Sequence, residues 1–287
     1  MKIIISHLPI PKLTRTILQA ISFTNDIRIN ILYIDITDGL PMHVSMKTFL
    51  QLSFISMLCI SHQSFADHSP NALQVRTIAI APYGIDDSGK LSGIYYELTH
   101  SLLIKSGLAS EHHIFPYGRI IHELKLGKTD LTIMFKYKEL ANYVDYIHPL
   151  PALKNVVIGR HGHDYQNIEQ LEGLNIAYLN GAKFSYEVDN NPKIHKQIVV
   201  DFNQGLLMLK KGRVDAIIGP MKPIISGAKQ LGLSKSFFGK PLIVSERTPW
   251  LQLSKQSESH ISAEKIKAIF SKMIAQGALE NLQLKYQ

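Results

Sequence analysis

Short apolar runs alternate with segments of helical periodicity along residues 75–284. The runs Val75–Pro82, Leu131–Phe135 and Asn175–Leu179 predict buried strands, because they are short, apolar and bounded by turn residues. Residues Ile94–Ser106 carry leucines at helical spacing and stop before Gly107, which predicts a helix. Further strands are expected at 156–159, 199–200, 215–219, 242–244 and 250–253, and further helices at 119–126, 167–171, 203–211, 224–231 and 263–284. This alternation predicts an α/β fold with mainly parallel sheets.

One pattern, Leu-x-x-Gly-basic-x-Asp-apolar, occurs twice. It runs from Leu124 to Asp130 and again from Leu209 to Asp215. In each copy a predicted helix ends at a glycine, which takes the left-handed conformation readily, and a buried strand follows the Asp. Two copies of one helix-to-strand unit predict two similarly built lobes.

A third pattern lies near the start of the chain. Met46-Lys-Thr is followed by the apolar run Phe49–Ile60 and then by small residues at Ser64 and Ala66. This is the layout of a secretory signal peptide, and the run is shorter than the roughly 20 residues of a membrane span. We therefore expect a signal peptide at 46–66, an upstream extension at 1–45 and a mature chain that begins near Asp67. The predicted location is the periplasm.

Composition narrows the possible functions. The single cysteine, Cys59, lies in the predicted signal peptide, so the mature chain is expected to lack disulfides and cysteine metal sites. The net charge of +8 comes from scattered lysines and arginines without a nucleic-acid-binding motif. We expect no nucleic acid as a partner.

Metal and catalytic sites have weak support in the sequence. His161, His163 and Asp164 lie close enough in sequence to share a metal, but a site needs three or four ligands and no second cluster is evident. Glu139 and His148 are the available acid–base candidates near the predicted strand-end loops, and each has an ordinary structural alternative. His112 and His113 are expected in a solvated loop. We expect no metal, no cofactor and no enzymatic activity.

Seven segments in a fixed order carry a resemblance to a known family. The order resembles that of bacterial periplasmic solute-binding proteins of the polar amino-acid type, extracellular solute-binding family 3. The segments are Ile78–Tyr83, Gly89–Leu98, Leu124–Ile133, Tyr143–Pro149, Leu171–Ala177, Gly212–Gly219 and Ala275–Leu282.

This resemblance implies a type II periplasmic binding protein fold, with two α/β lobes joined by two crossing strands and a ligand held between them. By that layout, lobe 1 comprises residues 67–157 plus 243–287, and lobe 2 comprises 158–242. The implied function is capture of a small molecule for an ABC permease, with the binding protein a monomer. The alternatives are a sensory or adaptor module that signals to a membrane receptor, and a dehydratase-like enzyme on the same fold.

The sequence departs from the family at both charged positions of an α-amino-acid site. The Arg that pairs with the ligand carboxylate is absent, since its position falls on Leu140 or Asn142. Pro220 stands in place of the acidic residue that holds the ligand amine. We therefore expect a small polar or anionic organic ligand rather than an ordinary amino acid.

The candidate ligand-binding residues lie at the carboxyl ends of predicted strands, where open α/β sheets bind ligands. They supply aromatic faces, backbone donors and cations. Arg119 has the alternative role of bracing its lobe, and each lysine that of a surface residue. The candidates are Tyr83, Arg119, Phe135, Lys136, Tyr137, Gly181, Ala182, Lys183, Pro220 and Lys222.

Overall fold

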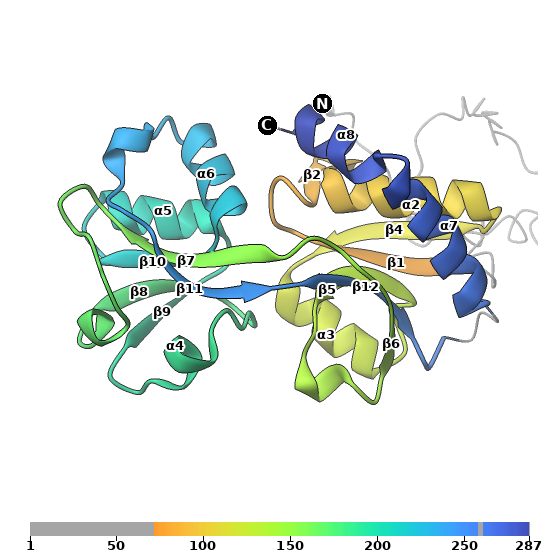
Figure 1. The fold of residues 1–287 in the computed structure, drawn as a ribbon, viewed down its shortest axis with the longest axis horizontal. Coiled ribbons are helices and arrows are strands. Elements are labelled where there is room, and N and C mark those ends of the chain that lie inside the picture. The colour runs from red at the N-terminus through yellow and green to blue at the C-terminus, as the bar shows by residue number, and fades with distance from the viewer. Residues whose placement is uncertain (1–71, 258–260, 287) are drawn as a thin grey trace, which may run out of the picture. The chain divides into compact units, whose positions relative to one another are not determined.

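The computed structural model describes residues 72–257 and 261–286, all within one compact unit, Phe65–Gln287. The elements of this unit form two lobes, each built on a five-stranded sheet (Figure 1). The predicted extension (1–45) and the predicted signal peptide (46–66) lie outside the described residues. None of the helices in the described ranges is long and apolar enough to cross a membrane.

The first sheet has the strand order β4-β1-β5-β12-β6. β1 pairs in parallel with β4 and β5, whereas β12 is antiparallel to β5 and β6. Helices α2, α7 and α8 cover one face and α3 the other (Figure 1). The strands are β1 (Leu73–Ile78), β4 (Ser110–Phe115), β5 (Leu131–Phe135), β6 (Val144–Pro149) and β12 (Pro249–Ser254); the helices are α2 (Ile94–Ser106), α3 (Tyr117–Lys125), α7 (Ala263–Ala275) and α8 (Ala278–Lys285). A small hairpin, β2 (Ile85–Asp87) and β3 (Lys90–Ser92), precedes α2.

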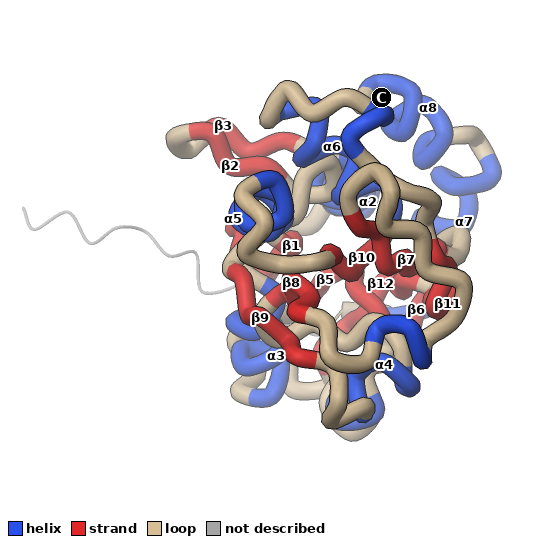
Figure 2. The backbone as a smooth tube through the Cα atoms, turned by 90° about the vertical axis from the view of Figure 1, so that its left-hand side faces the viewer, coloured by secondary structure: helices blue, strands red, loops and turns tan. Residues whose placement is uncertain are grey.

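The second sheet has the order β11-β7-β10-β8-β9. β8 pairs in parallel with β9 and β10, and β7 is antiparallel to β10 and β11. Figure 2 shows the strands of both sheets inside and the helices around them. The elements are β7 (Leu153–Gly159), β8 (Asn175–Leu179), α4 (Tyr186–Asn190), β9 (His195–Val199), α5 (Phe202–Lys210), β10 (Ala216–Pro220), α6 (Met221–Gln230) and β11 (Leu242–Arg247).

The chain passes twice between the lobes. β6 ends at Pro149 in the first sheet and β7 begins at Leu153 in the second; β11 ends at Arg247 and β12 returns to the first sheet from Pro249. The boundaries expected after residues 157 and 242 fall within or beside β7 and β11, which pair in the second sheet. The chain changes sheet at residues 150–152 and at 248.

The repeated sequence pattern performs the same structural task in both lobes. In the first, the Asp130 carboxylate accepts the Gln74 N–H at 2.7 Å; in the second, Asp215 accepts the Asn175 N–H at 2.8 Å. The backbone N–H of each Asp also donates to the carbonyl of the same partner. Each Asp therefore holds the start of one strand beside the start of a parallel strand, β5 beside β1 in the first lobe and β10 beside β8 in the second.

Three expectations from the sequence were wrong in detail. The sheets are mixed rather than mainly parallel, because strands beside each crossover run against the parallel set. His112 and His113 lie in the edge strand β4, not in a solvated loop. Residues Val199–Val200 mark the end of β9, not the beginning of a strand, since the polar, exposed residues before them mask its start.

Candidate functional site

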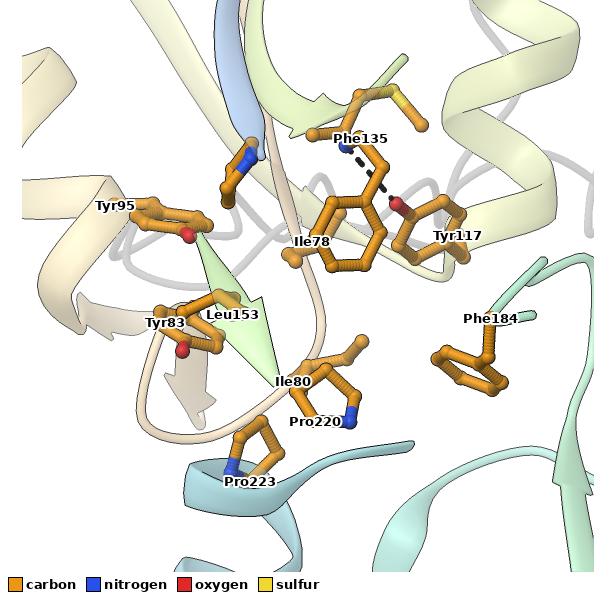
Figure 3. A pocket seen from close by; sticks show the side chains of 12 residues that line it. Ile78, Ile80, Tyr83, Tyr95, Tyr117, Phe135, Leu153, Phe184, Pro220 and Pro223 are labelled. Carbon is orange, nitrogen blue, oxygen red and sulfur yellow. Dashed lines mark hydrogen bonds between the residues drawn. The ribbon is translucent and has the colours of Figure 1, made fainter. Parts of the chain in front are cut away.

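Loops at the carboxyl ends of β1, β5, β8 and β10 meet around a cavity between the two lobes. The empty space is about 340 Å³ when its open mouth is counted, and the enclosed part is far smaller. Its lining is aromatic and aliphatic (Figure 3). The lining residues are Ile78, Ile80, Tyr83, Tyr95, Tyr117, Met134, Phe135, Leu153, Phe184, Pro220, Pro223 and Pro249.

Tyr83 is placed by a tight loop after β1. A Cβ on Gly84 would lie 2.3 Å from the Ile78 carbonyl oxygen, and one on Gly93 would lie 2.6 Å from the Tyr83 carbonyl oxygen. Gly93 also has a φ of 116°, in the region that favours glycine. The two glycines let the backbone fold closely enough for the Tyr83 ring to stack on Tyr95, with 4.3 Å between ring centroids.

The cavity tyrosines are neutral hydrogen-bonding groups. Burial raises the pKa of Tyr83, Tyr95, Tyr117 and Tyr137, so their phenols stay protonated at neutral pH. Tyr117 Oη accepts the Phe135 N–H at 3.3 Å. The Oη atom of Tyr83 is buried and has no hydrogen-bond partner among the described residues. Buried hydroxyls without partners are unusual in proteins and suit a site that receives a polar group.

Arg247, at the end of β11, places a guanidinium beside this cavity. It donates to the carbonyl oxygens of Lys136 in one lobe and Lys183 in the other. Its Cζ lies 4.7 Å from the ring centroid of Phe135 and 5.2 Å from that of Tyr137, a cation–π arrangement. Arg247 is not among the predicted site residues, because it lies on a crossover strand rather than in a strand-end loop.

Both crossover strands also hold the loop after β8. Asn155 on β7 donates through Nδ2 to the Phe184 carbonyl at 3.2 Å and to Ser245 Oγ on β11 at 2.9 Å. Ser245 Oγ in turn donates to the Phe184 carbonyl. This network fixes Phe184 in the cavity wall and ties it to the segments that connect the lobes.

Of the predicted site residues, Tyr83, Phe135 and Pro220 line the cavity. Tyr137 is buried behind the lining and packs against Tyr117, with 5.7 Å between ring centroids. In the loop after β8, Ala182 is buried, whereas Gly181, with a φ of 74°, and Lys183 are exposed. Gly181, Ala182 and Lys183 are not part of the lining.

The three remaining predicted cations also lie outside the lining. The Lys136 ammonium sits 3.7 Å from the ring centroid of Trp250 and 4.5 Å from that of Tyr146. Arg119 stacks on Phe115 at 3.4 Å and its Nε donates to Glu123 at 2.8 Å, which matches the bracing alternative. Lys222 lies in the first turn of α6, where burial lowers its pKa. As ligand contacts these residues remain predictions.

Two of the other chemically suggestive residues make structural contacts. Asp164 accepts the Lys240 N–H at 2.7 Å, and the His148 ring packs against Phe270, with 5.3 Å between ring centroids. Within residues 72–257 and 261–286 no group of three or more His, Cys, Asp or Glu side chains is arranged to hold a metal ion.

Comparisons with known proteins give structural relatives only. No protein-family model and no curated protein matches the chain. A mutant of ArgBP from T. maritima has a TM-score of 0.65 and 19% identity, covering 77% of this chain and 97% of its own. An ancestral arginine-binding protein bound to arginine has a TM-score of 0.63 and 23% identity, covering 76% of this chain and 99% of its own. A histidine kinase sensor domain with similarity to periplasmic binding proteins has a TM-score of 0.64 and 16% identity, covering 75% of this chain and 96% of its own.

At these identities the likeness shows the fold. The chain has the type II periplasmic binding protein fold, with two α/β lobes joined by two crossing strands, so the predicted fold class is confirmed. In this fold the cavity described above lies between the lobes and beside both crossovers. A molecule bound there contacts loops from both lobes at once.

Proposed function

We propose that this protein is a periplasmic solute-binding protein that captures a small polar or anionic organic molecule between its lobes. The observation that supports this most directly is the cavity, whose walls come from strand-end loops of both sheets. Strand ends of open α/β sheets are the preferred ligand sites of such folds. Solved structures of the same fold include the substrate binding protein of an amino acid ABC transporter.

Binding in this proposal works by closure of the lobes. Two short connections, at residues 150–152 and 248, leave the angle between the lobes adjustable. A ligand that contacts Tyr83 and Phe135 on one side and Phe184 and Pro220 on the other stabilises the closed arrangement over the open one. A closed, ligand-loaded protein then presents a different surface to a membrane permease.

Location and assembly are part of the same proposal. The signal peptide at Met46–Ala66 directs the mature chain to the periplasm, where it acts as a freely diffusing monomer beside an ABC permease. N-terminal sequencing of protein recovered from periplasmic extracts tests this, with a start near Asp67 as the expected result. A cytoplasmic chain that still carries residue 1 contradicts it.

A sensory role is the second candidate. Two of the similar structures are a Bordetella pertussis BvgS periplasmic VFT2 domain and a histidine kinase sensor domain. The same closure of lobes that loads a transporter also transmits a signal to a membrane receptor. Co-purification from membranes with a permease or with a sensor kinase discriminates between the two roles.

We propose binding rather than catalysis. The cavity lining contains no Asp, Glu, His, Lys or Cys among the described residues, and its tyrosines have raised pKa values. General acid–base catalysis needs a group that exchanges a proton near the working pH. A dehydratase-like activity is the least favoured alternative.

A thermal-shift screen combined with solution X-ray scattering tests the proposal. A ligand at about one hundred times its dissociation constant adds roughly 2.7 kcal/mol of stability and raises the melting temperature. We expect the same compound to reduce the radius of gyration. If compounds raise the melting temperature without any compaction, capture by closure is wrong.

A further inference from the structure

The residues that line the cavity determine which kind of molecule, apart from its charged group, can bind there. Five aromatic rings and three prolines face the space, and no charged side chain in the described ranges lines it. Figure 3 shows Tyr83 with Tyr95, Tyr117 near Phe135, and Phe184 across from them. Such walls bind a flat apolar ring by burial and stacking, and they reject a strongly hydrated body.

The same walls offer no carboxylate to an ammonium group. An α-amino acid brings a cation that needs a carboxylate when it is taken out of water. The described lining has no Asp or Glu, and the chain carries Pro220 at the end of β10. A zwitterionic ligand would leave its ammonium without a charged partner in this cavity.

Arg247 supplies an unneutralised positive charge at the edge of the cavity. A guanidinium has five N–H donors, and Arg247 donates to two carbonyl oxygens, those of Lys136 and Lys183. No carboxylate forms an ion pair with it among the described residues. It lies against Phe135, whose ring lines the cavity, with 4.7 Å between the Arg247 Cζ and the centroid of that ring.

From these observations we infer that the ligand is a small monocarboxylate with an apolar, ring-bearing body and no ammonium group. Its carboxylate pairs with Arg247 and its ring lies among the cavity tyrosines. This inference rests on the proposed function and specifies the ligand class of the same cavity.

Arg247 already connects the lobes, because it donates to one main-chain carbonyl in each. A carboxylate bound to its guanidinium therefore becomes part of a contact between the two lobes. Charge-assisted, planar pairing of this kind is stronger than a neutral hydrogen bond and depends on the guanidinium geometry. Binding of the carboxylate and closure of the lobes are thereby linked at one side chain.

Calorimetric titration of the full mature chain with matched ligands tests the inference. The probes are benzoate, phenylacetate, 3-phenylpropanoate and cyclohexanecarboxylate, each paired with its primary amide, together with phenylalanine and arginine. We expect at least one carboxylate to bind with a dissociation constant below 1 mM. We also expect it to bind at least tenfold more tightly than its amide and than either amino acid.

Variants of Arg247 distinguish recognition of the ligand carboxylate from a purely structural role of this side chain. Arg247→Gln is expected to weaken the carboxylate at least tenfold and the amide less than threefold, whereas Arg247→Lys gives an intermediate loss. Arg213→Gln, an exposed arginine in the turn between α5 and β10, is the matched control and keeps the wild-type preference. Equal weakening of acid and amide by Arg247→Gln overturns the inference and assigns Arg247 a structural role.

The inference also fails independently of the proposed function. If no carboxylate of the set binds below 1 mM while another compound compacts the protein in scattering, the ligand class is wrong and capture by closure stands. If the amino acids bind more tightly than the ring carboxylates, the ligand class is again wrong. If nothing in a broad screen compacts the protein, both proposals fail.

Discussion

Gly118 and Gly181 bring the two lobes into direct backbone contact. A Cβ built on Gly181 would lie 2.9 Å from Gly118 Cα and 3.0 Å from its N. Gly118 belongs to the first turn of α3 in one lobe, and Gly181 to the loop after β8 in the other. Side-chain atoms essentially never approach this closely, so the arrangement of the lobes requires glycine at position 181.

Gly181→Ala is therefore expected to oppose closure. The added methyl collides with α3, and the φ of 74° costs about 1 kcal/mol for a residue with a Cβ. We expect weaker ligand binding and a larger radius of gyration at saturating ligand. Gly118→Ala is the control, because its Cβ would meet Gly181 Cα at 3.9 Å, an ordinary contact. Equal behaviour of the two variants would show that this contact does not limit closure.

A buried ion pair in the first lobe gives a second prediction. Glu123 accepts Arg76 Nε at 3.0 Å and Arg119 Nε at 2.8 Å, and both Glu123 and Arg76 are 8% exposed. Burial alone raises the pKa of Glu123, but the bonds from Arg119 and Arg76 outweigh it and leave the pKa lowered.

Glu123→Gln is expected to reduce the free energy of unfolding by roughly 2–4 kcal/mol, since it removes the carboxylate that forms an ion pair with the buried Arg76. Urea denaturation measures the change. Glu246→Gln removes the exposed partner of Lys154, 3.8 Å away, and should leave the midpoint unchanged. A similar small effect at Glu123 would mean that water solvates Arg76 in the variant.

His112 makes stability depend on pH. Burial, together with the charges of His100, Arg76 and His113, lowers the pKa of His112 to about 4. The unfolded chain therefore binds more protons than the folded chain between pH 6.5 and 4. The contribution of neutral His112 to the free energy of unfolding is complete above pH 6.5 and is lost as the pH falls. At pH 5 the loss is roughly 2 kcal/mol.

Measurement of the melting temperature across this range, in wild type and in His112→Phe, isolates the effect. Phenylalanine keeps the edge contact with Tyr96, which lies 5.2 Å from His112 between ring centroids. The difference between the two curves should grow from pH 6.5 to pH 4. Parallel curves would assign the acid sensitivity to other groups.

Lys136 tests the sequence-based site directly. Its ammonium lies over Trp250 and Tyr146, so we expect Lys136→Ala to cost roughly 0.5–1 kcal/mol of stability and to change ligand affinity less than threefold. Trp250 is the single tryptophan, so its fluorescence can be used to follow unfolding, and calorimetric titration measures the affinity. A tenfold fall in affinity would instead support Lys136 as a ligand contact.

Local patterns in the sequence predicted much of the fold. The helix at Ile94–Ser106 and the strands at Leu131–Phe135 and Asn175–Leu179 have the predicted bounds, because each has a clear period and a turn residue beside it. The repeat around Asp130 and Asp215 predicted two similar units. β4 was missed, since its partly buried polar residues, among them His112, resemble a loop.

The lining of the cavity was predicted less completely. Tyr83, Phe135 and Pro220 follow from the rule that ligands bind at strand ends. Arg247 does not, because its guanidinium reaches carbonyls of Lys136 and Lys183, which are distant in sequence. Tyr95, on α2, lines the cavity because it stacks on Tyr83, a contact set by the tertiary fold.

The strand order of the first sheet has a consequence for biosynthesis. β12 lies between β5 and β6 and supplies the sheet pairing of β6, yet it follows both in the chain by the whole second lobe. As the chain emerges in order, the segment from β7 to β11 is therefore complete before β6 has its neighbour. The second lobe is one continuous segment and can fold first, while the first lobe still has an open sheet edge. A chain released before β12 has emerged would expose that edge to aggregation.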